Sequence, residues 1–202
     1  NLAIRQKNVQ AHYELAVLYH RGEGLPKDDE KAVWLYRLAA EKGHAKARYD
    51  LGLLYEYGDG LPQNMEKAVQ LYRLAANGGN EDAQFSLGHA YETGQGGLKK
   101  DLKEAARLYE LAAQKGNVQA MNSLGYAYQK GKGVKKDPAA AMQYYRKAFE
   151  KGSMTAAVLI GALYEKGRGV AKDKTEAARW YAIAAQSGNA AAQKALLRVQ
   201  RR

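Results

Sequence analysis

The sequence of 202 residues contains no cysteine, which excludes disulfide bonds and metal sites built on thiolates. It contains no run of 18 or more apolar residues, the length that a membrane-spanning helix needs, and no signal peptide is visible. Hydrophobic residues nevertheless make up 46% of the chain, which is enough to form a continuous core.

The sequence also lacks a recognisable set of catalytic groups, which would have to converge on one place. Its histidines have no metal-ligand spacing such as HExxH: they are His12, His20, His44 and His89. None of the serines at 86, 123, 153 and 187 lies in an S-x-x-K or G-x-S-x-G context. We therefore expect no enzymatic activity, no metal and no cofactor.

A glycine loop occurs five times along the chain. Each copy reads G-x-G, an aliphatic residue, two further residues, and Asp or Asn; the copies begin at Gly22, Gly58, Gly94, Gly131 and Gly167. A nucleotide-binding loop would be a single loop after a strand, with a full GxGxxG or GK[ST]. Five evenly spaced copies indicate a repeat array instead.

The period of the array is 36 residues, with one extra residue, Gly97, in the third copy. The predicted repeats are 11–46, 47–82, 83–119, 120–155 and 156–191. Residues 1–10 are expected to be the end of a preceding second helix, stopped near Lys7, and residues 192–202 a C-terminal capping helix. Together they would form one continuous solenoid domain.

Each repeat predicts two helices. Apolar residues at positions one, five, eight and nine place one face of the first helix in the core. Position six is Ala or Gly, so that helix backbones can approach closely. Position nine is always tyrosine, and we expect these side chains to be core residues: Tyr19, Tyr55, Tyr91, Tyr128 and Tyr164.

The second helix begins after the last residue of the loop, which is a predicted N-cap: Asp28, Asn64, Asp101, Asp137 and Asp173. Glu104 and Glu176 lie three residues further on and would complete capping boxes. The buried face recurs as Ala32, Tyr36, Ala39 and Ala40. A glycine then ends the helix (Gly43, Gly79, Gly116, Gly152 and Gly188), and Asn or Ser caps the next hairpin at 80, 117, 153 and 189.

The composite pattern A-x3-LG-x2-Y-x2-G-x-G-[LV]-x2-D-x3-A-x2-[WL]Y-x2-AA-x2-G resembles the Sel1-like repeat, a relative of the tetratricopeptide repeat, over residues 11–191. The predicted fold is an all-α, right-handed α-solenoid of stacked hairpins. The resemblance implies a role in assembling complexes, and bacterial members are often exported to the cell envelope or secreted.

The net charge of +11 lies almost entirely beyond residue 119 and favours an anionic partner. Loop cations of the last repeats form a candidate basic rim: Lys132, Lys135, Lys136, Arg168 and Lys172. Solvated turn residues are the alternative interpretation. Through this rim the chain could bind a lipid head group, a glycan or an acidic protein.

Positions that vary between copies on the first helices are the second candidate site, a concave stripe opposite the core face. Its residues are Val17, Arg21, Asp50, Leu53, Tyr57, His89, Tyr126, Lys130 and Lys166. Apolar and aromatic side chains among separated charges suit a partner protein or peptide. We therefore expect a non-enzymatic scaffold or adaptor. Nucleic acid is a weaker candidate, because no base-contacting set recurs between the repeats.

Overall fold

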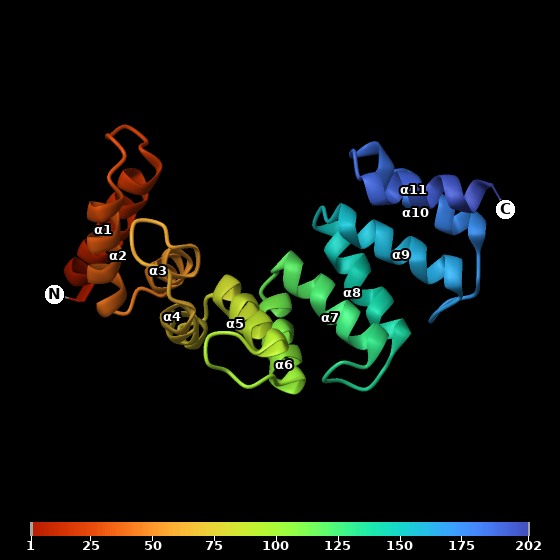
Figure 1. The fold of residues 1–202 in the computed structure, drawn as a ribbon, viewed down its shortest axis with the longest axis horizontal. Helices are drawn as coiled ribbons and strands as arrows, with labels where there is room; N and C mark the ends of the chain where they lie inside the picture. Colours follow the sequence, from red (N-terminus) through yellow and green to blue (C-terminus); the bar gives the residue numbers. More distant parts are fainter. Residues whose placement is uncertain (1, 202) are drawn as a thin grey trace. The chain divides into compact units, whose positions relative to one another are not determined.

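The computed structural model describes residues 2–201, and within them the only regular secondary structure is eleven α-helices (Figure 1). The helices are α1 (Leu2–Arg21), α2 (Asp29–Glu41), α3 (Ala45–Tyr57), α4 (Met65–Asn77), α5 (Glu81–Thr93), α6 (Leu102–Gln114), α7 (Val118–Lys130), α8 (Pro138–Glu150), α9 (Met154–Lys166), α10 (Lys174–Gln186) and α11 (Ala190–Gln200). The predicted all-α fold of paired helices is confirmed.

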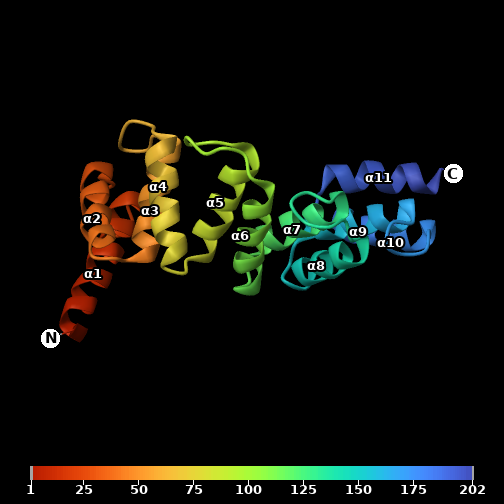
Figure 2. The same ribbon diagram turned by 90° about the horizontal axis from the view of Figure 1, so that it is seen from below.

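The helices form two compact units, Asn1–Asp101 with α1–α5 and Leu102–Arg202 with α6–α11. Within each unit, consecutive helices pack against one another, as Figure 2 shows for α2, α3 and α4. A lone hairpin would leave one apolar face uncovered, so stacking on the next hairpin completes the core. The single continuous domain expected from the sequence stays a prediction.

Helix α1 runs from Leu2 to Arg21 without a break. The separate preceding helix predicted for residues 1–10, with its stop near Lys7, is therefore not a separate helix in residues 2–10. Residues 1 and 202, and the side chains of residues 2–7, lie outside what the structure describes. At the other end, α11 packs on α10 and α9 at the place of the predicted capping helix.

The loop that joins the two helices of a hairpin is closed by one recurring hydrogen bond. The backbone N–H of the last loop residue donates to the carbonyl of the tyrosine at position nine, as from Asp28 to Tyr19 at 3.0 Å and from Asp173 to Tyr164 at 3.0 Å. The side chains of four predicted caps, Asp28, Asn64, Asp137 and Asp173, accept from the first turn, for example Asn64 Oδ1 from the N–H of Lys67 at 2.9 Å.

The capping box predicted at Glu176 is wrong, because the N–H of Asp173 that the glutamate would need donates to the Tyr164 carbonyl. The Glu176 carboxylate instead accepts from Arg179 and Trp180 at 3.1 and 3.0 Å. At the other predicted box, the N–H of Asp101 donates to the Tyr91 carbonyl at 2.9 Å, and the Glu104 carboxylate accepts from Arg107 at 2.8 and 2.6 Å.

The two glycines of each loop have structural roles. The first ends the first helix in the left-handed conformation, as at Gly167 with φ 61°. From the second repeat onward, the second lies against the start of the preceding second helix: a Cβ on Gly169 would be 2.6 Å from the carbonyl carbon of Pro138. The glycines of this loop, which first suggested a nucleotide-binding loop, are therefore explained by the backbone structure of the hairpin.

The tyrosines at position nine are half-buried, so their prediction as core residues is only partly right: Tyr19, Tyr55 and Tyr164 pack against buried clusters without being enclosed. Apart from Tyr13 of α1, the buried tyrosines lie on second helices, among them Tyr72, Tyr145 and Tyr181, which are at most 1% exposed. The position-nine rings lie beside second helices: Tyr55 Oη accepts from Arg37 of α2 at 3.1 Å, and Lys67 of α4 lies over its ring.

Candidate interaction surfaces

The concave stripe has its first six residues in the unit of α1–α5. Arg21, Tyr57 and His89 are exposed, and Tyr57 is 71% exposed, the largest value among the large hydrophobic side chains of the described residues. Val17 and Leu53 are half-buried, and Val17 packs against the core of the first two hairpins. The stripe is therefore only partly available to a partner.

Asp50, predicted to orient a ligand, is half-buried and already engaged. Its carboxylate accepts a hydrogen bond from the Tyr13 hydroxyl, which ties α3 to α1. Burial raises the pKa of Asp50, more than the Tyr13 hydrogen bond and nearby Lys46 lower it. Asp50 thus contributes to packing between first helices.

In the second unit the structure brings the stripe and the basic rim together. The Nζ atoms of Lys130 and Lys132 lie 5.7 and 4.9 Å from the centre of the Tyr126 ring. Tyr126 is 38% exposed, so part of an aromatic ring that contacts two lysine ammonium groups faces solvent. The sequence placed Lys130 in one candidate site and Lys132 in the other.

The remaining predicted cations are exposed but not gathered around this ring. Lys166 and Arg168 follow one another around the end of α9, and Lys135 lies in the loop before α8. The main chains of Lys136 and Lys172 pack against the first glycines of their loops, Gly131 and Gly167. A Cβ atom added to Gly131 would lie 3.6 Å from the Cα of Lys136, and one added to Gly167 would lie 3.4 Å from the Cα of Lys172. Lys27 does the same in the first repeat, so this backbone position is structural and only the ammonium group is open to a ligand.

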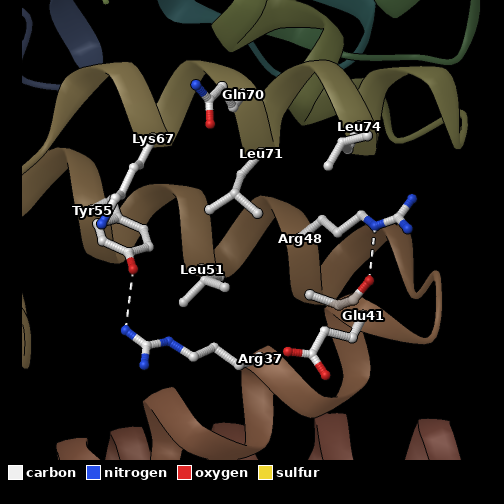
Figure 3. A pocket seen from close by; sticks show the side chains of 10 residues that line it. Arg37, Glu41, Arg48, Leu51, Tyr55, Lys67, Gln70, Leu71 and Leu74 are labelled. Carbon is white, nitrogen blue, oxygen red and sulfur yellow. Dashed lines mark hydrogen bonds between the residues drawn. The ribbon is translucent and has the colours of Figure 1, made fainter.

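A third surface, which the sequence did not reveal, is a groove between α2 and α4 with α3 beneath it (Figure 3). Its volume is about 380 Å³. Its lining combines apolar and charged side chains: Leu51, Leu71, Leu74 and Tyr55 with Arg37, Arg48, Lys67 and Glu41.

Sequence reasoning missed this groove because it assigned positions five and nine of α3, Leu51 and Tyr55, to the core. One signal was present. Position two carries an arginine only in the second copy, Arg48, where the other copies have His12, Gln84, Met121 and Ala157. An arginine at a position that is uncharged or histidine in the other copies is the signal by which this surface could have been found.

The part of the chain that the structure describes contains neither a candidate metal site nor a candidate membrane-spanning helix. No three His, Asp or Glu side chains there are grouped so that they could hold a metal ion. Among the described helices, none combines the length and the apolar character needed to cross a membrane.

Stacked α-hairpins, with exposed side chains that vary between copies, define the chain as an α-hairpin repeat protein. The pattern of the Sel1 repeat matches residues 9–44, 45–80, 81–117, 118–153 and 155–189, so the chain belongs to the Sel1 repeat family. These segments begin one or two residues before the predicted repeats.

Solved structures of bacterial proteins share this fold. A Sel1 repeat protein from Oxalobacter formigenes is 40% identical, with a TM-score of 0.88 over 95% of this chain and 76% of its own. The Escherichia coli protein c5321, a protective antigen with an SLR fold, is 36% identical, with a TM-score of 0.87 over 96% of this chain. This chain spans only 41% of the length of c5321.

Helicobacter pylori cysteine rich protein B is 30% identical over 66% of this chain and 95% of its own, with a TM-score of 0.52. No curated protein compared with the chain matches it.

Proposed function

We propose that the chain is a non-enzymatic scaffold that binds a partner protein or peptide through the exposed face of its first helices. The observation that carries the proposal is the exposed Tyr126 ring, with the Nζ atoms of Lys130 and Lys132 at 5.7 and 4.9 Å from its centre. Tyrosine is among the residues enriched at the positions that dominate binding energy at protein interfaces. Membership in the Sel1 repeat family supports a scaffold role.

The charge of the second unit supports an acidic partner for this face. Residues 102–202 contain 19 Lys and Arg against seven Asp and Glu, whereas residues 1–101 contain 13 against 14. A surface of one sign accelerates encounter with a partner of the opposite sign and selects against like-charged proteins.

A second candidate function is the binding of an anionic lipid head group or glycan through the rim alone. The exposure of Lys135, Arg168 and Lys172 favours it. Such binding would rest on charge, so it would weaken steeply with salt, whereas binding centred on tyrosine would change less.

The test is affinity capture with the intact chain, followed by measurement of the captured partner's Kd. Tyr126→Ala should weaken binding by roughly 2 kcal/mol if its ring lies at the centre of the interface. Tyr57→Ala tests separately the exposed tyrosine of the first unit. Trp34→Ala is the matched control, because Trp34 is 62% exposed but lies on second helix α2. A partner indifferent to both tyrosine changes contradicts the proposal.

The rim is tested separately by the triple change Lys135→Gln, Lys136→Gln and Lys172→Gln. Lys132 is left in place because it contacts Tyr126. Loss of binding in the triple variant, with the tyrosine variants unaffected, would instead favour the anionic-ligand function.

A further inference from the structure

The groove between α2 and α4 has the composition of a binding site of its own. Leu51 forms a buried part of its floor, whereas Leu71 is half-buried and Leu74 is 48% exposed. Apolar side chains left open in this way gain free energy when a ligand covers them. A volume of about 380 Å³ lies within the range of roughly 300–1,000 Å³ typical of ligand sites.

Cations lie at both ends of this apolar floor (Figure 3). Arg37 and Lys67 meet at Tyr55: the Arg37 Nη2 donates to Tyr55 Oη at 3.1 Å, and Lys67 Nζ lies 5.3 Å from the ring centre. Arg48 lies at the other end. Glu41 is the one acidic residue of the lining, so the lining carries a net positive charge.

The arginines are held in place before any ligand arrives. Arg48 Nε donates to the carbonyl of Ala40 at 2.9 Å, which leaves its two terminal nitrogens as donors. Fixing a guanidinium in advance lowers the entropy that a partner must overcome on binding. The guanidinium fork also matches a carboxylate in geometry.

We propose that this groove binds a segment of a partner protein in which an acidic side chain lies next to a leucine or phenylalanine. The apolar side chain covers Leu51, Leu71 and Leu74, and carboxylates pair with Arg48 at one end and with Lys67 and Arg37 at the other. The net positive lining selects an acidic segment, and Glu41 repels acidic side chains only locally.

This inference goes beyond the proposed function, because the groove shares no residue with the concave stripe. Binding at the groove and binding at the stripe can therefore succeed or fail independently, and one set of variants separates them.

The experiment begins with selection of a phage-displayed library of random dodecapeptides on the intact chain. Enriched peptides are expected to place Asp or Glu beside Leu or Phe. The Kd of the most enriched peptide is then measured by fluorescence anisotropy with the unaltered chain and its variants.

The decisive variant is Arg48→Gln combined with Lys67→Gln. Gln84 occupies the place of Arg48 in the next repeat and donates to the Ala76 carbonyl at 3.4 Å, so glutamine keeps the structural contact and removes the charge. We expect the double variant to weaken peptide binding at least tenfold.

Arg73→Gln is the matched control, because Arg73 lies on α4 at the position that Arg37 has on α2 but does not line the groove. It should change the Kd less than twofold, as should Tyr126→Ala. The proposal is overturned if no peptide is enriched, if enriched peptides lack the acidic and apolar pair, or if the double variant binds them as tightly as the unaltered chain.

Discussion

A Cβ atom on Gly52 would lie 2.6 Å from Cε1 of Tyr72, closer than two carbon atoms can approach without movement. Gly52 is on the first helix of the hairpin and the fully buried Tyr72 is on the second. The ring therefore fills the space that a side chain at 52 would need. The same pairing recurs between Gly161 and Tyr181 at 2.7 Å.

The first prediction follows from this pair. Gly52→Ala should destabilise the chain by about 1–2 kcal/mol, because overpacking costs roughly 1–3 kcal/mol and a helical alanine returns up to about 1 kcal/mol. The measurement is urea unfolding followed by circular dichroism. Tyr72→Leu in the Gly52→Ala background should cost less than it does alone. A gain in stability from Gly52→Ala would show that the helices separate freely.

A second prediction distinguishes the two kinds of tyrosine. Tyr72→Ala should lower the free energy of unfolding by about 3–5 kcal/mol, as expected for a fully buried aromatic ring. Tyr55→Ala should cost only about 1–2 kcal/mol, because its ring is half-buried and its hydroxyl contacts the exposed Arg37. Equal losses in thermal or urea unfolding would contradict this assignment.

The third prediction concerns pH and His44, the N-cap of α3. Its Nδ1 accepts from the Ala47 N–H at 3.0 Å, and its Nε2 lies 2.9 Å from Gln10 Oε1. Burial, with Lys46 nearby, lowers the pKa of His44. The unfolded chain therefore takes up this proton first, so stability falls as the pH drops below about 6.5 towards the lowered pKa.

His44→Asn is the matched variant, since asparagine caps the equivalent helices at Asn80 and Asn117. It should retain stability at pH 8 and lose less stability than the unaltered chain between about pH 7 and pH 5. Thermal unfolding across this range measures the difference. Parallel pH profiles would exclude His44 as the source of the loss.

The fourth prediction concerns Glu165, which joins α9 to α10 and α11. It accepts from the Tyr181 hydroxyl at 2.8 Å and from Arg198 Nη2 at 2.6 Å. Burial alone would raise the pKa of Glu165, but these two hydrogen bonds and the charge of Arg198 lower it. The contribution of the carboxylate to stability is therefore present above about pH 4.3 and is lost as the pH falls towards the lowered pKa.

Glu165→Gln should cost about 1 kcal/mol at pH 7, because Arg198 is largely exposed and water moderates the loss. The difference from the unaltered chain should shrink as the pH falls below about 4. Tyr181→Phe is the control, because it removes one hydrogen bond and keeps the carboxylate paired with Arg198. A constant difference between pH 7 and pH 3 would contradict the ionic contribution.

The sequence by itself determined the local structure of this protein. Evenly spaced glycine loops, caps such as Asn64 and stops such as Gly167 act within a few residues, so their pattern predicts each hairpin directly. A 36-residue period then predicts the stacking, because the same apolar faces recur in every copy.

Tertiary structure decided which repeated positions are buried and which surfaces are open. A tyrosine occurs in every repeat both at the position of Tyr55 and at the position of Tyr72. Only the packing of α2, α3 and α4 leaves the Tyr55 ring half-buried and the Tyr72 ring fully buried. The same packing joins Arg37, Arg48 and Lys67 around a groove, although they are up to 30 residues apart in sequence. A periodic pattern describes one helix at a time, whereas a groove depends on three helices together.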